Sequence, residues 1–114
     1  MRSAPAVIAY LKTFHPRVST QLDTVLPAVR VTLVYSYEGN RYEQAPVYQI
    51  EAWADTEGQA DILANQLWDE WPKFHGAWGN QWIIGAWTVS IPRPLPDPTT
   101  NKYRYMFEGG MRLG

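Results

Sequence analysis

The stretch 46–72 changes its hydrophobic period once, and this change limits the fold more than any other feature of the 114-residue sequence. In 47–54 apolar and polar side chains alternate, as is typical of a half-buried strand. After Thr56, apolar residues recur at spacings of three and four until Pro72, which predicts an amphipathic helix. Thr56 and Gln59 have the spacing of a capping box. A strand that passes directly into a helix predicts a fold that combines a sheet with helices.

The remaining chain supplies one more helix and several strands. We predict a helix over 4–14 with Ser3 as its N-cap, and strands over 17–22, 28–35, 82–91 and 102–113. Within the last strand, Gly109 and Gly110 predict a bulge or bend. The expected architecture is a single α+β domain, 1–114. Its antiparallel sheet has four to five strands, with both helices packed on one face.

The other face of this sheet is expected to be uncovered. Trp53 lies on the polar face of strand 47–54, Trp82 is expected beside it, and Ile62 lies on the polar side of the second helix. An apolar side chain on a polar face contributes little to a monomer and is typical of an interaction surface. Trp53 and Ile62 are therefore predicted to lie at subunit interfaces.

Two connections are predicted to project from the domain. The segment 36–46 resembles an exposed hairpin loop longer than a minimal turn, with Tyr37, Arg41 and Tyr42 as its contact residues.

The second connection, 92–98, has proline at every second position. Proline withholds a backbone amide, so this segment cannot pair as an inner strand, and the spacing does not fit the three-residue repeat of polyproline II ligands. We predict a stiff arm that leaves the sheet and docks on an adjacent subunit or on another component of the assembly. Leu95 is the expected anchor, and Arg93 and Asp97 are expected to set the register.

The sequence has no pattern that predicts catalysis, a metal site or a cofactor. It has no cysteine, which fits a reducing cytoplasm, and His15 and His75 lack carboxylates spaced to complete a metal site. No nucleophile elbow or phosphate loop is present. A net charge of −1 argues against a protein that coats nucleic acid. No membrane span is expected. The six Trp and seven Tyr, with GAWGNQW at 76–82, leave a carbohydrate-binding module as an alternative.

Three stretches taken together resemble a known family. They are PVYQIEAWADTEGQADILANQL (46–67), PRPLPDP (92–98) and YRYMFEGGMRL (103–113). In this order they resemble the tail terminator proteins of long-tailed, non-contractile bacteriophages, which are small α+β proteins of about this length. The similarity of pattern covers about residues 4–113, and the aromatic segment 71–82 has no counterpart in it.

The resemblance implies a structural, non-enzymatic virion protein. Such a protein forms a hexameric ring that caps the head-proximal end of the tail tube, ends tube polymerisation and joins the tail to the head connector. The expected partners are other copies of the chain, the major tail tube protein and a head completion or connector protein. DNA passes through the lumen without specific binding, and assembly occurs in the host cytoplasm. The segment 36–46 is then expected to contact the tube or a neighbouring ring. Another head-to-tail joining or tail-completion protein is the alternative within this class.

Overall fold

A computed structural model describes the backbone of residues 3–40, 43–97 and 99–114, and their side chains except those of 36–40, 43 and 44. The elements in chain order are α1 (Ala4–Leu11), β1 (Val18–Ser19), β2 (Ala28–Asn40), β3 (Glu43–Ala54), α2 (Glu57–Glu70), the 3₁₀ turn η1 (Trp71–Lys73), β4 (Gly76–Trp78), β5 (Gln81–Thr88), β6 (Arg93–Pro94) and β7 (Tyr103–Leu113).

The described residues form one sheet with the strand order β1-β2-β3-β7-β5-β4, and β6 also pairs with β7. All neighbours are antiparallel except β1 and β2, which are parallel. The prediction of four to five strands was too low. The two additional strands are short: β4 lies within the aromatic segment 71–82, for which no strand before residue 82 was predicted, and β6 lies within the predicted arm.

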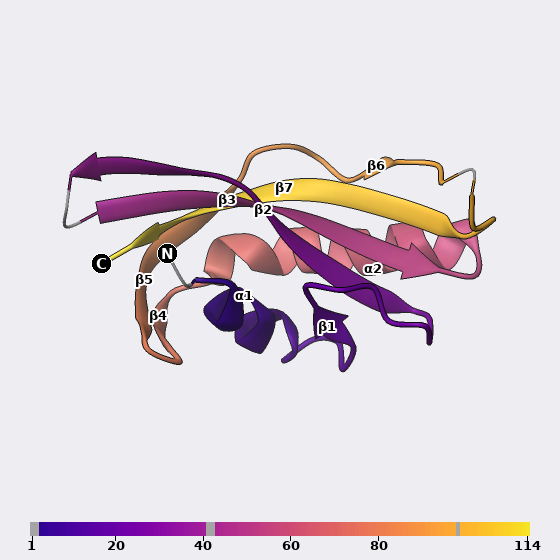
Figure 1. Cartoon of the computed structure of the whole chain (residues 1–114), viewed down its shortest axis with the longest axis horizontal. Coiled ribbons are helices and arrows are strands. Elements are labelled where there is room, and N and C mark those ends of the chain that lie inside the picture. The colour runs from indigo at the N-terminus through magenta and orange to yellow at the C-terminus, as the bar shows by residue number, and fades with distance from the viewer. Residues whose placement is uncertain (1–2, 41–42, 98) are drawn as a thin grey trace.

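Both helices lie on the same face of the sheet, as predicted (Figure 1). The second helix has the predicted cap, because the Thr56 side chain accepts a hydrogen bond from the Gln59 amide. Its apolar face, with Leu63 and Leu67, packs into the same core as Val7 and Leu11 of α1. The mixed α+β architecture predicted from the sequence is thus confirmed.

The first helix is shorter than predicted. It ends at Leu11, after which the amides of Thr13 and Phe14 bond to carbonyls three residues earlier instead of four. This tighter turn ends the α-helix before the His15-Pro16 pair. Ser3 does not cap the helix with its side chain; its hydroxyl instead bonds the buried hydroxyl of Tyr48. The N-terminus of α1 is therefore fixed to the middle of β3.

The segment 36–46, predicted as a long loop, is paired strand over most of its described residues. Backbone pairing continues through Tyr37 opposite Ala45 and reaches Asn40 opposite Glu43. Most of the segment therefore belongs to a long β2–β3 hairpin, because the strands extend well past the last alternating apolar residue.

Gly109 and Gly110 do not form a bulge against β3, since the register runs unbroken along this part of β7. Glycine is required at both positions because an indole ring lies directly against each Cα atom. A Cβ on Gly109 would overlap the Trp71 ring, and one on Gly110 would lie 2.6 Å from the Trp87 ring. Trp71 is fully buried, and its indole Nε1 donates a 2.9 Å hydrogen bond to the Gly110 carbonyl.

We expect Gly109→Ala to lower the free energy of unfolding by about 2 kcal/mol or more, because overpacking a rigid core costs about 1–3 kcal/mol. Urea unfolding of Gly109→Ala beside Gly58→Ala measures this. Gly58 lies in α2, and a methyl group added there would have no neighbouring atom within 4 Å, so its substitution should leave stability unchanged or slightly higher. Equal stability of the two variants would show that Trp71 moves freely.

Candidate functional site

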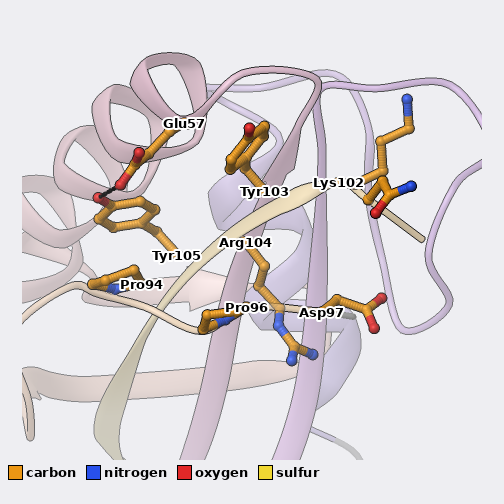
Figure 2. A pocket seen from close by; sticks show the side chains of 9 residues that line it. Glu57, Pro94, Pro96, Asp97, Lys102, Tyr103, Arg104 and Tyr105 are labelled. Atoms are coloured by element: carbon orange, nitrogen blue, oxygen red, sulfur yellow. Dashed lines mark hydrogen bonds between the residues drawn. The ribbon is translucent and has the colours of Figure 1, made fainter. Parts of the chain in front are cut away.

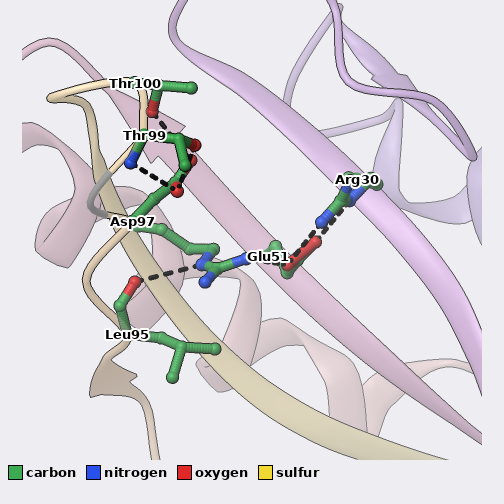
Figure 3. Close-up of polar contacts among 7 residues, drawn as sticks. Arg30, Glu51, Leu95, Asp97, Thr99 and Thr100 are labelled. Carbon is green, nitrogen blue, oxygen red and sulfur yellow. Dashed lines mark hydrogen bonds and ion pairs between the residues drawn. The ribbon is translucent and has the colours of Figure 1, made fainter.

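The sheet face opposite the helices carries a cluster of charged residues around Glu51. Glu51 is 0% exposed and lies between two arginines from neighbouring strands. Arg30 Nε and Nη2 lie 2.5 and 3.0 Å from its two carboxylate oxygens, and Arg104 Nη1 lies 3.1 Å from Oε2 (Figure 3). The hydrogen bond to Glu51 raises the pKa of Arg30. One carboxylate thus joins β2, β3 and β7 on this face.

Trp53 belongs to the same cluster and is not uncovered, so its predicted exposure was wrong. Its side chain is 2% exposed. The guanidinium carbons of Arg104 and Arg30 lie 4.8 and 5.7 Å from the centre of its ring, within range for cation–π contact. Two arginines from the adjacent strands cover this indole, so it cannot serve as an exposed interface residue in this conformation.

The proline segment also differs from its prediction. It does not leave the sheet: β6 pairs along β7, with Arg93 opposite Met106 and Pro94 opposite Tyr105. The Leu95 amide donates to the Arg104 carbonyl at 2.8 Å, and the Leu95 carbonyl accepts from Arg104 Nε at 3.0 Å (Figure 3). The expected arm is therefore an edge strand of its own subunit.

Strand geometry explains why the prolines alternate. Successive backbone amides of a strand point to opposite sides, so when Leu95 donates toward β7 its neighbours Pro94 and Pro96 face away. The missing amides therefore fall on the outer side, where no hydrogen bond is lost. The prolines do exclude an inner strand, as predicted. They are compatible with an edge strand, which the prediction did not consider.

The two charged residues of this segment bind within the subunit. Arg93 contacts Ser90 Oγ at 3.1 Å and Glu108 at 3.5 Å. Asp97 accepts hydrogen bonds from Thr99 and Thr100, which lower its pKa (Figure 3). A further contact of Arg93, Leu95 or Asp97 with an adjacent subunit stays a prediction.

A pocket of about 540 Å³ lies where the proline segment meets β7 (Figure 2). Pro94 and Pro96 form one wall, and Tyr103 and Tyr105 contribute aromatic rings. Glu57 of α2 accepts a 3.0 Å hydrogen bond from the Tyr105 hydroxyl and raises the pKa of that group. No sequence pattern indicated this pocket, because it exists only when the proline segment folds back.

Apolar side chains are exposed at other places on the surface. Ile62 is 72% exposed on α2, and Trp82 is 57% exposed on β5, so the predicted exposure of both is confirmed. Two further groups were not singled out from the sequence. They are Leu33, Val34 and Tyr35 on β2, and Ile84, Trp87, Val89 and Ile91 on and after β5.

The GAWGNQW segment does not form an exposed row of aromatic rings. Trp78 packs edge-on against Tyr10 and Phe74, with ring centroids 5.2 and 6.0 Å away, and its indole donates to the His75 carbonyl. Trp82 is left as the exposed ring of the segment. Of the two tryptophans in this segment, Trp78 therefore packs against the core and Trp82 is exposed.

The remaining predicted contact residues are placed only in part. Tyr37 has a described backbone, paired with Ala45, while Arg41 and Tyr42 lie outside the described residues. Across residues 3–40, 43–97 and 99–114, no three His, Asp or Glu residues come together as metal ligands. No helix in the described chain has the length and apolar character needed to cross a membrane.

Comparison with known proteins gives matches to solved structures. No protein-family model matches the chain, and no curated protein matches it. A solved structure described as the virion of a native gene transfer agent particle contains a chain with a similar fold. The TM-score is 0.59 at 16% sequence identity, over 98% of this chain and 87% of that one. At this identity the likeness shows a shared fold.

We expect Glu51→Gln to lower the free energy of unfolding by about 3 kcal/mol, because removing one partner of a buried ion pair leaves uncompensated charge. Thermal or urea unfolding measures the loss. Asp55→Asn is the matched control, since it breaks the exposed Asp55–Lys102 pair, for which about 0.2–1 kcal/mol is expected. Similar losses in the two variants would mean that the Glu51 cluster does not hold the sheet face together.

Proposed function

We propose that this chain is a structural virion protein, and specifically a tail terminator. Copies form a hexameric ring on the head-proximal end of a tail tube, stop the addition of tube subunits and present a surface to the head connector. The observation that carries the proposal is the fold shared with a chain of a gene transfer agent virion over 98% of this chain. The ordered resemblance of 46–67, 92–98 and 103–113 to tail terminators supplies the specific role.

The distribution of exposed apolar residues supports assembly into a ring. A ring built from head-to-tail contacts needs two different complementary surfaces on each subunit. Exposed apolar groups occur on β2, on β5 and at Ile62, which are separate parts of the chain. A single patch would favour a two-fold dimer instead.

The charge of the chain fits a channel through which DNA slides. Each phosphate contact by Lys or Arg adds salt-dependent affinity, which would hold the DNA in place. The net charge is −1, and Arg30 and Arg104 are engaged by Glu51. The proposed role is therefore structural, with no catalytic step and no cofactor.

The proposal is tested by adding the purified protein to polymerising tail tube protein from the same virus. Negative-stain microscopy should show shorter tubes, each with a six-fold ring at one end. Tubes of unchanged length, with the protein bound only to the head connector, would instead favour another head-to-tail joining protein. Binding to immobilised polysaccharide without any effect on tubes would favour the carbohydrate-binding module.

We expect Ile62→Asp to weaken ring assembly while leaving the subunit folded. Surface substitutions change stability by about 0.5 kcal/mol or less, whereas an apolar interface residue can contribute about 2 kcal/mol or more to association. Gln66→Asp, one turn along the exposed side of α2, is the matched control. Light scattering in the presence of tube protein measures assembly, and urea unfolding measures the subunit. A loss of subunit stability equal to the loss of assembly would contradict an interface role for Ile62.

A further inference from the structure

Strands β2 and β5, next to the short end strands β1 and β4, each have a long stretch with a free side among the described residues. On one side, β1 covers only Val29 and Arg30, so β2 from Val31 onward pairs with β3 alone. On the other side, β4 covers only Gln81–Ile83, so β5 from Ile84 to Thr88 pairs with β7 alone. Each stretch presents backbone donors and acceptors on its free side.

These two free stretches lie at the same height in the sheet. The register connects Leu33 through Tyr48 and Gly109 to Thr88, and it connects Tyr35 through Val47 and Gly110 to Trp87. A copy placed beside this one without an axial shift therefore puts its Leu33–Tyr35 opposite the segment near Trp87. A head-to-tail contact closes into a ring when it has no axial shift and its rotation divides a full turn, whereas a shifted contact generates a helix.

The strand directions also match. Each step from β2 to β3, β7 and β5 is antiparallel, so β2 and β5 run in opposite directions. Rotation about a ring axis that runs along the strands keeps these directions. The β2 strand of one copy therefore meets the β5 strand of the next in antiparallel orientation. Each of the two strands has a register shift near the contact, between Leu33 and Tyr35 in β2 and between Ile83 and Gly85 in β5.

The side chains on both edges are apolar. Leu33, Val34 and Tyr35 are exposed on β2, and Ile84 and Trp87 are exposed on β5 beside Trp82. Counting Trp82, each of the two edges therefore carries three exposed apolar side chains.

The proline segment limits where this pairing can occur. β6 continues the β5 side of β7, but Pro92, Pro94 and Pro96 remove the outward amides that an added strand would need. The open stretch on this side therefore ends before Pro92. Strand addition at one defined place favours a single register.

We infer that copies of this chain join by continuing the sheet, with the free edge of β2 in one copy paired antiparallel to β5 residues 84–88 of the next. The closed ring is part of the proposed function, on which this inference rests. The inference adds which two strands form the interface between neighbouring copies. The partner is a second copy of the same chain.

Cysteine cross-linking tests this contact, and the chain has no cysteine of its own. Val34→Cys is combined in turn with Ile84→Cys, Ala86→Cys or Thr88→Cys, which covers the neighbouring registers. Directly opposite residues on paired strands bring their Cβ atoms to about 4.5–5.5 Å, and the closer, non-hydrogen-bonded pairs reach the upper end of the about 3.5–4.5 Å found in disulfides. Val34→Cys with Gln66→Cys, on exposed α2, is the control pair. Oxidation is carried out on the purified full chain up to its solubility limit, alone and on tail tubes.

At least one of the three pairs should give a ladder of covalent oligomers on a non-reducing gel, while the control pair and single variants give dimers at most. Absence of a ladder from all three pairs under both conditions, or an equal ladder from the control, would overturn the inference. The same samples are scored for tube length. A ladder without tube termination keeps the edge contact and rejects the tail terminator role, whereas termination without a ladder rejects only the edge contact.

Discussion

The arrangement of the sheet face opposite the helices depends on the buried carboxylate of Glu51. It binds Arg30 and Arg104 at once, and both guanidinium groups then cover Trp53. The same Arg104 holds the Leu95 carbonyl, so the proline segment is fixed to the sheet by a residue that the carboxylate has already positioned. A buried ion pair adds little net stability when compared with apolar residues, but loss of one partner is strongly destabilising. Glu51 therefore determines the shape of this face more than it adds to the stability of the core.

This arrangement changes how the proline segment is understood. Alternating prolines resemble a projecting arm when the sequence is considered alone, yet in the structure they close one part of a sheet edge. Pairing along β7 satisfies the amide of Leu95, and Pro94 and Pro96 present no amide on the outer side. An edge treated in this way is protected from unwanted strand addition, while β5 and β2 remain open. Both open strands carry exposed apolar residues: Leu33, Val34 and Tyr35 on β2, and Trp82, Ile84 and Trp87 on β5.

Local patterns predicted the elements that depend on local interactions. The hydrophobic period predicted strands β3, β5 and β7 and the packing of both helices on one face. The period and the Thr56 cap together predicted helix α2. The burial of Trp53 could not be predicted, because its cover comes from Arg30 and Arg104, which are distant in sequence. Strand β6 was missed for a different reason: its alternating prolines exclude an inner strand but not an edge strand, whose outward amides form no hydrogen bond. The pocket beside Tyr103 and Tyr105 depends on that pairing and had no sequence signal.

The proposed ring subunit combines these features: a rigid α+β domain, one sheet edge closed by prolines, and two open edges at equal height. The most direct test is a cryo-electron microscopy map of the neck of the assembled particle. The account predicts six copies in a closed ring at the head-proximal end of the tail tube, with β2 of each copy beside β5 of the next. Five-fold or twelve-fold symmetry of this chain, isolated copies, or its location away from the tube end would contradict it.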